Sequence, residues 1–190
     1  MIYLKKVLMI KEALHALQNK QIILYPTDTV WGIGGDATSV EVVEKIYQLK
    51  QRTDHKSLIA LVKDIKMLTS YVDEIPETAI PYLKEIRPTT LIYPKGINLA
   101  PNLMGSDGSI GLRIPRHNFC QELLVAFGKP IISTSANISG SETPKNFNGI
   151  ASKILEGVDY IVHLQQETKP NPPSRVIKIE TNGEVNILRV

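Results

Sequence analysis

Three short polar side chains and three glycines follow an apolar run near the start of the chain. The run ends at Pro26, and Thr27, Asp28 and Thr29 come directly after it. Proline ends a strand because it has no N–H to donate. We therefore expect these polar groups at a strand end, where open α/β sheets bind ligands. The glycines within residues 32–35 allow close approach, so the pattern predicts one wall of a binding site for a small polar ligand.

The same glycines also match the residue types and spacing of a dinucleotide-binding motif. Gly32, Gly34 and Ala37 have its spacing, and a helix is expected to follow. In dinucleotide-binding folds the first glycine comes directly at the strand end, whereas residues 27–31 separate Pro26 from Gly32 here. A dinucleotide-binding unit is therefore disfavoured. A second alternative to a ligand-binding site is that these glycines serve only a tight turn.

A cluster of basic residues lies at the end of the helix that is expected next. Its members are Lys50, Arg52 and Lys56. Arginine suits bidentate phosphate contacts and lysine supplies a point charge, so the cluster has the chemistry of a phosphate cradle. Cations at a helix C-terminus also complement the helix dipole, by about 0.3–1 kcal/mol, and this purely structural explanation stays open.

A run of short hydrogen-bonding side chains follows another apolar strand. It includes Ser133, Thr134, Ser135 and Asn137. At a strand end such groups recognise a polar ligand, or alternatively form a turn and a helix cap. A serine nucleophile is not expected, because the sequence has no Gly-x-Ser-x-Gly elbow and no evident histidine partner.

Arg113 lies inside an apolar strand sequence, residues 110–114. Buried arginines are rare unless they are paired, so Arg113 meets either an internal carboxylate or a ligand anion. The four histidines are scattered and Cys120 is the only cysteine. We therefore expect no metal site built from protein ligands and no disulfide framework.

The composition is that of an ordinary globular chain. Its 190 residues are 43% hydrophobic and 22% charged, with a net charge of +3, which fits one domain over residues 1–190. The small positive charge suits anionic small ligands as well as nucleic acid. The sequence has neither a membrane-length apolar run nor a secretory signal, so a cytoplasmic location without membrane contact is expected.

Apolar periodicity predicts helices and strands that intermix along the chain. Helices are expected in the segment before residue 20 and over residues 38–50, 64–70, 76–86, 118–127 and 148–155. Strands are expected at residues 22–25, 57–62, 89–93, 109–114, 130–132 and 160–164, and in a closing hairpin at 175–179 and 185–189 joined by Asn182-Gly183. Because the chain ends in a hairpin, the sheet must be mixed rather than purely parallel.

Several blocks of the sequence, in one order, resemble the YrdC/TsaC family of threonylcarbamoyl-AMP synthases. They are Tyr-Pro-Thr-Asp-Thr-Val-Trp-Gly-Ile-Gly at 25–34, Leu-Lys-Gln-Arg at 49–52 with Lys-Ser-Leu at 56–58, Gly-Leu-Arg-Ile-Pro at 111–115, Ser-Thr-Ser-Ala-Asn-Ile-Ser-Gly at 133–140, Pro-Ser-Arg-Val-Ile at 173–177 and Ile-Leu-Arg at 187–189. Each block alone is weak evidence for the family. The ordered set is specific for it and covers nearly the whole chain.

This resemblance implies both a fold and a reaction. The fold is a single YrdC-like α+β (mixed α/β) domain, with a twisted, mostly antiparallel or mixed sheet, flanking helices and a concave basic cavity. In the reaction, L-threonine, bicarbonate or CO2, and ATP give threonylcarbamoyl-AMP and pyrophosphate. Mg²⁺ is expected to accompany ATP. Other proteins, the downstream threonylcarbamoyl transferase partners, then modify a tRNA adenosine to t6A.

The resemblance also assigns roles to individual residues. The catalytic set is Lys50, Arg52, Ser135 and Asn137. The ATP-binding set is Arg52, Lys56, Ser135, Thr143 and Arg189. The threonine-binding set is Thr27, Thr29, Arg113, Ser133 and Ser174.

The sequence departs from the family pattern at two notable positions, and two other functions remain as alternatives. Trp31 replaces the family's usual tyrosine, and Leu61 stands where some members carry a histidine that contacts threonine, so the strictness for threonine is not fixed. The alternatives are a non-catalytic module that binds double-stranded RNA or tRNA with a basic concave face, and a carbamoyl-type transferase with another acceptor.

Overall fold

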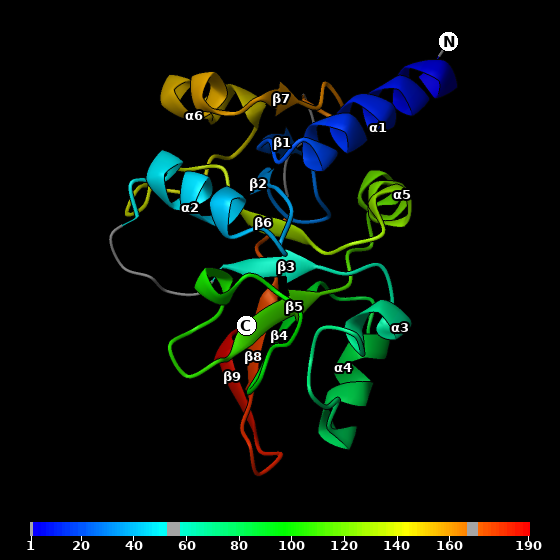
Figure 1. Ribbon diagram of the computed structural model, residues 1–190, viewed down its shortest axis with the longest axis vertical. Helices are drawn as coiled ribbons and strands as arrows, with labels where there is room; N and C mark the ends of the chain where they lie inside the picture. The colour runs from blue at the N-terminus through cyan, green and yellow to red at the C-terminus, as the bar shows by residue number, and fades with distance from the viewer. Residues whose placement is uncertain (1, 53–57, 167–170) are drawn as a thin grey trace.

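Nine strands form one mixed sheet in the part of the chain that this computed structural model describes, residues 2–52, 58–166 and 171–190. The strand order is β7-β1-β2-β6-β3-β5-β4-β8-β9 (Figure 1). Five neighbouring pairs are antiparallel and three are parallel. The expectation of a mixed, mostly antiparallel sheet with flanking helices is therefore confirmed, and we infer that the chain forms a single domain around it.

The elements alternate along the chain. The strands are β1 (Ile23–Tyr25), β2 (Gly32–Gly34), β3 (Ile59–Leu61), β4 (Thr89–Tyr93), β5 (Ile110–Arg113), β6 (Ile131–Ser135), β7 (Tyr160–Ile161), β8 (Arg175–Ile179) and β9 (Val185–Arg189). The helices are α1 (Ile2–Gln18), α2 (Val40–Leu49), α3 (Ile65–Leu68), α4 (Ile80–Lys84), α5 (Asn118–Phe127) and α6 (Ser152–Gly157), with 3-10 turns η1 (Glu77–Ala79), η2 (Pro101–Leu103) and η3 (Phe147–Gly149). No helix among these is long and apolar enough to cross a bilayer.

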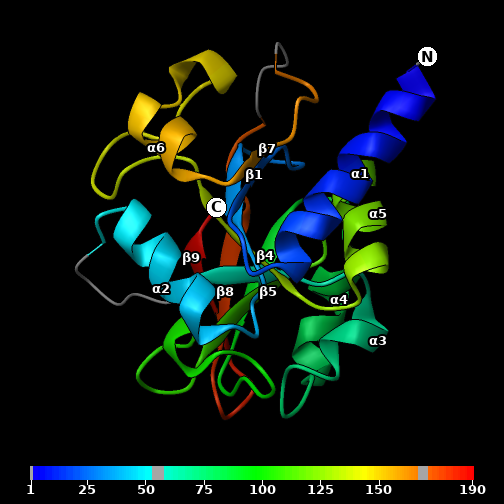
Figure 2. The ribbon, with the colours of Figure 1, turned by 45° about the horizontal axis from the view of Figure 1, so that its top comes forward.

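Helices cover both faces of the sheet, with α1 and α5 on one side of it and α2 and α6 on the other (Figures 1 and 2). Strand alternation sends neighbouring side chains to opposite faces. In β1, Ile23 and Tyr25 join the apolar cluster beneath α1 and α5, while Leu24 joins the larger cluster beneath α2. The two clusters fix the register of the central strands, because a one-residue slip would exchange their buried side chains.

Local chemistry explains where the elements differ from the expected ones. Ser39, rather than Thr38, caps α2, because the Thr38 hydroxyl donates to Asp36 at 2.6 Å. The long helix expected over 76–86 is the 3-10 turn η1 followed by the five-residue α4. Pro81 at the start of α4 has no N–H to continue an earlier helix. In contrast, α5 ends at Gly128 as expected, with a left-handed φ of 72°.

The glycine-rich segment forms strand β2, although its composition predicts only a place of close approach. β2 lies between β1 and β6. A Cβ atom at Gly34 would lie 2.5 Å from the Tyr25 ring and 2.6 Å from the main-chain oxygen of Ile132. Glycine is therefore required there because two neighbouring strands leave no space for a side chain.

Replacing Gly34 with alanine is expected to destabilise the fold by about 1–3 kcal/mol or more, since a main-chain oxygen blocks the added methyl group. Gly149→Ala is the matched control, because a Cβ there meets its first neighbour at an ordinary 3.5 Å. Urea unfolding of both variants measures the difference. Equal unfolding midpoints for the two variants would contradict this account of β2.

Candidate active site

A cavity of about 210 Å³ opens near the middle of the sheet. We call it the central cavity. The ends of β5, β6 and β9, the β1–β2 loop and the residues that follow α2 all contribute to its lining. Eight residues from the predicted catalytic and binding sets line it together: Thr29, Arg52, Arg113, Ser133, Ser135, Thr143, Ser174 and Arg189. Segments far apart in the sequence therefore meet at one place, while the roles predicted for these residues stay predictions.

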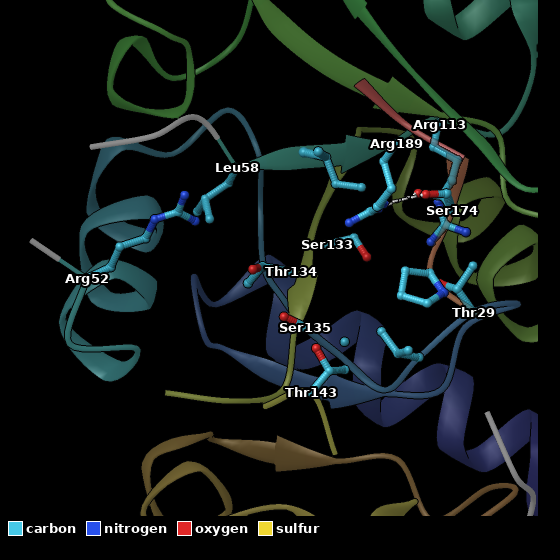
Figure 3. A pocket seen from close by; sticks show the side chains of 14 residues that line it. Thr29, Arg52, Leu58, Arg113, Ser133, Thr134, Ser135, Thr143, Ser174 and Arg189 are labelled. Carbon is cyan, nitrogen blue, oxygen red and sulfur yellow. Dashed lines mark hydrogen bonds between the residues drawn. The ribbon is translucent and has the colours of Figure 1, made fainter. Parts of the chain in front are cut away.

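The central cavity has two chemically different ends. Figure 3 shows Arg113, Arg189 and Ser174 gathered at one end, and Arg52 beside Leu58 at the other. Strand β6 runs between them and carries Ser133, Thr134 and Ser135 along the cavity wall. One end is thus suited to a small anionic ligand with a hydroxyl group, and the other to a larger ligand with phosphates.

A second cavity of about 260 Å³ adjoins the central one and shares Arg52, Thr134 and Ser135 with it. Lys50 and Asn137 line this adjoining cavity. The Lys-x-Arg pair after α2 and the Ser-x-Asn pair that begins at the last residue of β6 therefore lie around the same hollow, although they are separated by more than eighty positions in the sequence. The four residues predicted as catalytic lie around these two connected hollows.

Lys50 is buried, with only 3% of its surface exposed. Its ammonium group donates to the main-chain oxygens of Ser135 at 2.5 Å and Asn137 at 2.7 Å, and its own carbonyl accepts from the Ser139 amide at 2.8 Å. Burial first, and then repulsion from Arg52, lower the pKa of Lys50 from its ordinary value to about 8. Lys50 therefore holds the turn after β6 in shape.

Asn137 is fixed from the same turn. Its amide nitrogen donates to the main-chain oxygens of Ile138 at 3.0 Å and Ser141 at 2.8 Å. Its Oδ1 atom is buried and meets no hydrogen-bond partner among the described residues. Buried polar atoms normally have a partner, so this oxygen is suited to accept a hydrogen bond from a ligand or an ordered water.

The opposite end carries hydroxyl groups that are already oriented. Thr27 and Thr29 share a hydrogen bond between their hydroxyls at 3.0 Å, and Thr27 also donates to the carbonyl of Val30 at 2.8 Å. Thr29 lines the central cavity, whereas Thr27 lines a different hollow on the other side of the loop. Thr27 thus shapes the loop, and Thr29 presents its side chain to the cavity.

Arg189 and Ser174 are joined across the last two strands. The Arg189 Nε donates to the Ser174 carbonyl at 2.9 Å, and the Ser174 hydroxyl lies 2.8 Å from that of Thr90. Burial first, and then repulsion from Arg113, lower the pKa of Arg189 below its ordinary value. The two guanidinium groups are therefore close enough to affect one another.

Arg113 combines the two possibilities that the sequence left open. It is 3% exposed and its Nη1 lies 2.5 Å from the carboxylate of Asp28, so it meets an internal carboxylate. It also lines the central cavity, and its Nε has no hydrogen-bond partner among the described residues. One edge of the guanidinium is anchored by the protein, and another remains to bind a ligand.

Lys56 lies outside the described residues, so its predicted ATP contact stays a prediction. Within the described ranges, no three side chains of the types His, Cys, Asp and Glu gather in an arrangement that could hold a metal ion.

Comparison with protein families identifies the chain. The family model Sua5/YciO/YrdC, described as telomere recombination, matches residues 15–190. The chain belongs to this family. A relative named threonylcarbamoyl-AMP synthase, from Pseudoalteromonas translucida, is 33% identical over 182 residues, which cover 93% of this chain and 95% of the relative.

Solved structures of Sua5/YciO/YrdC proteins have the same fold. E. coli YciO superimposes with a TM-score of 0.82 at 26% identity, over 97% of this chain and 89% of its own. P. abyssi Sua5 complexed with L-threonine gives a TM-score of 0.83 at 26% identity over 95% of this chain. The chain spans about half of that Sua5, covering 53% of its length.

The predicted roles leave out several residues of this Sua5/YciO/YrdC site. Val30, Leu58 and Pro173 line the central cavity, but nothing in their types distinguishes them from ordinary strand and loop residues. Asp28 was expected on the wall of the binding site, whereas the structure makes it the partner of Arg113. The signal for Asp28 was available: an arginine in an apolar strand requires a carboxylate, and the first polar motif contains one.

The stability of this family member should depend on pH through Lys50. Between pH 8 and about 10.4, the folded state has lost the Lys50 proton while the unfolded state still holds it. The free energy of unfolding therefore rises with pH across this window, by roughly 3 kcal/mol from this group. Urea unfolding of the wild type and of Lys50→Met from pH 7 to 10.5 checks this, because the variant lacks the titrating group. Parallel stability profiles would show that Lys50 does not carry the effect.

Proposed function

We propose that this protein is a threonylcarbamoyl-AMP synthase, which converts L-threonine, bicarbonate or CO2, and ATP into threonylcarbamoyl-AMP and pyrophosphate. One observation carries the proposal: a single cavity has a guanidinium and hydroxyl end beside a phosphate-suited end, both reached from strand β6. The relationship to proteins named threonylcarbamoyl-AMP synthase over nearly the whole chain supports the same activity.

The threonine end is proposed from charge and hydrogen-bonding capacity. Arg113 is suited to the threonine carboxylate, because guanidinium groups bind carboxylates with directed hydrogen bonds. The hydroxyls of Thr29, Ser133 and Ser174 line the same part of the cavity and are suited to the amino and hydroxyl groups of the amino acid. The L-threonine complex of P. abyssi Sua5, which has the same fold, supports threonine as the ligand.

The nucleotide end is proposed around Arg52 and Ser135, which line both connected hollows. Arg52 supplies charge to the phosphates, while Lys50 and Asn137 shape the adjoining cavity. Thr143 also lines the central cavity and is proposed for the ATP-binding set, with Lys56 as a further cation. Arg189 was predicted for the same set but lies beside Ser174 at the Arg113 end (Figure 3), so we propose it for the amino-acid end instead. We expect Mg²⁺ to arrive with ATP, held by phosphate oxygens and water.

The chemistry needs positioned charge rather than a side-chain nucleophile. The threonine amine and bicarbonate give a carbamate and water. A carbamate oxygen then forms a bond to the α-phosphorus of ATP as the bond to the pyrophosphate oxygen breaks. Such a displacement is accelerated by aligned reactants and by cations that stabilise the developing charge, which are the functions proposed for this cavity.

Product transfer to tRNA requires other proteins, and we propose downstream threonylcarbamoyl transferase partners for it. Direct contact with tRNA or double-stranded RNA stays a prediction. RNA affinity that falls steeply with salt, beside ATP and threonine binding that falls much less, would indicate such contact.

The test of this function measures pyrophosphate release from ATP in the presence of L-threonine and bicarbonate, with each component omitted in turn. Release that requires all three supports the synthase. Equal release without threonine would overturn the assignment and would favour a carbamoyl-type transferase with another acceptor.

Arg52→Ala is expected to lower kcat/KM for pyrophosphate release about 100-fold or more, because it removes a cation that lines the proposed nucleotide end of the cavity. The matched control is Arg87→Ala, which removes an exposed arginine that does not line either cavity. Thermal unfolding of both variants accompanies the kinetics. Loss of the fold in Arg52→Ala, rather than loss of turnover alone, would favour the structural explanation for the basic cluster.

A further inference from the structure

Asp28 lies behind the central cavity rather than on its wall. Its carboxylate meets the Arg113 guanidinium at 2.5 Å through Oδ1 and accepts the main-chain N–H of Arg116 at 2.9 Å through Oδ2. Its own carbonyl accepts from the side-chain amide of Asn171 at 3.1 Å. It is not among the described residues that line the central cavity. Asp28 is therefore held at three points and holds Arg113 in turn.

The carboxylate also compensates for a repulsion within the site. Arg113 and Arg189 both line the central cavity, and the pKa of Arg189 is lowered by burial first and then by Arg113. Figure 3 shows their side chains at the same end of the cavity, with Ser174 beside them. Two guanidinium groups in one small hollow repel each other, and a fixed carboxylate behind one of them offsets part of that repulsion.

The anchoring leaves a defined part of Arg113 for a ligand. Its Nη1 is occupied by Asp28, while its buried Nε has no hydrogen-bond partner among the described residues. An unanchored arginine side chain has several rotatable bonds and would lose their freedom when it binds a carboxylate. With Asp28 in place, much of that ordering is complete before the ligand arrives.

We propose that Asp28 is the positioning residue of the amino-acid subsite: it fixes the Arg113 guanidinium so that its remaining N–H groups bind the substrate carboxylate. This inference rests on the proposed function, in which Arg113 binds threonine. Asp28 itself does not contact substrate. Its effect appears in the affinity for threonine and leaves the affinity for ATP unchanged.

The experiment compares Asp28→Asn with the wild type in the pyrophosphate-release assay. The amide keeps the shape of the side chain and loses its charge. The KM for L-threonine should rise about tenfold or more, because a charge-assisted contact loses its orientation, while the KM for ATP should change less than about twofold. An unchanged or lower KM for threonine would overturn the proposal, since a purely electrostatic effect would strengthen carboxylate binding.

A matched control separates this site from a general loss of acidic charge. Asp73→Asn makes the same substitution in an exposed ion pair with Lys95, and it should leave both KM values unchanged. A rise in the threonine KM of Asp73→Asn equal to that of Asp28→Asn would show that the effect does not come from Arg113.

A second variant keeps the proposal testable if Asp28→Asn does not fold. Asn171→Ala removes the hydrogen bond to the Asp28 carbonyl from an exposed position. It should raise the threonine KM about threefold without lowering the melting temperature. If Asp28→Asn is unfolded and Asn171→Ala retains the wild-type threonine KM, the proposal is wrong.

The proposed function and this inference fail in different ways. If the wild type releases pyrophosphate without threonine, the function itself is wrong. If the wild type requires threonine but Arg113→Met has an unchanged threonine KM, the role of Arg113 is wrong. If Arg113→Met has a raised threonine KM and Asp28→Asn does not, only the positioning role of Asp28 is wrong.

Discussion

A buried cation must have a partner, and this constraint determines how both ends of the cavity are built. Arg113 and Lys50 are each 3% exposed, and an isolated charge at such a depth would be strongly unfavourable. Arg113 is satisfied by the carboxylate of Asp28, whereas Lys50 is satisfied by main-chain oxygens of the turn after β6. Each partner comes from a different segment, so each cation also fixes the position of a loop that lines the site.

The two solutions have different electrostatic consequences. The Asp28 carboxylate holds the Arg113 guanidinium in position and balances its positive charge within the protein interior. Carbonyl partners supply no opposite charge to Lys50. Burial first, and then repulsion from Arg52, lower the pKa of Lys50 to about 8. Lys50 therefore serves mainly as a support, whereas Arg113 is held by Asp28 and still lines the central cavity. Arg52 and Arg189, which are half-buried and exposed, are better placed to gain and lose contacts as an anionic ligand enters and leaves.

Much of the fold followed from apolar runs that are bounded by proline and glycine. The strands near residues 22–25 and 89–93 and the closing hairpin formed where the pattern indicated. Strand β2 was missed because its glycines carry no strand propensity, and only the neighbouring β1 and β6 make Gly34 necessary. Similarly, α4 is shorter than its apolar spacing suggested, since Pro81 interrupts the hydrogen-bond pattern.

The site was predictable to the extent that its residues belong to local motifs. Thr29, Arg52 and Ser135 stand in recognisable blocks, and the structure brings these blocks to one cavity. The partnership of Asp28 with Arg113 was predictable only in part. A buried arginine requires an anionic partner, but 85 positions separate the two residues, and sequence spacing does not say which carboxylate the arginine meets. The same holds for Lys50, whose type suggested a phosphate contact and whose hydrogen bonds are to the main chain.

Strand β6 sets the distance between the two ends of the cavity. Ser133 and Ser135 are two positions apart, so alternation places them on the same face, about 7 Å apart along the strand. β3 pairs with Ser133 on one side of β6, and Gly32 of β2 pairs with Ser135 on the other. A strand that is paired on both edges resists stretching and slipping. Two ligands bound at its two ends would therefore meet at a separation that the backbone fixes, which is what an in-line displacement between them requires.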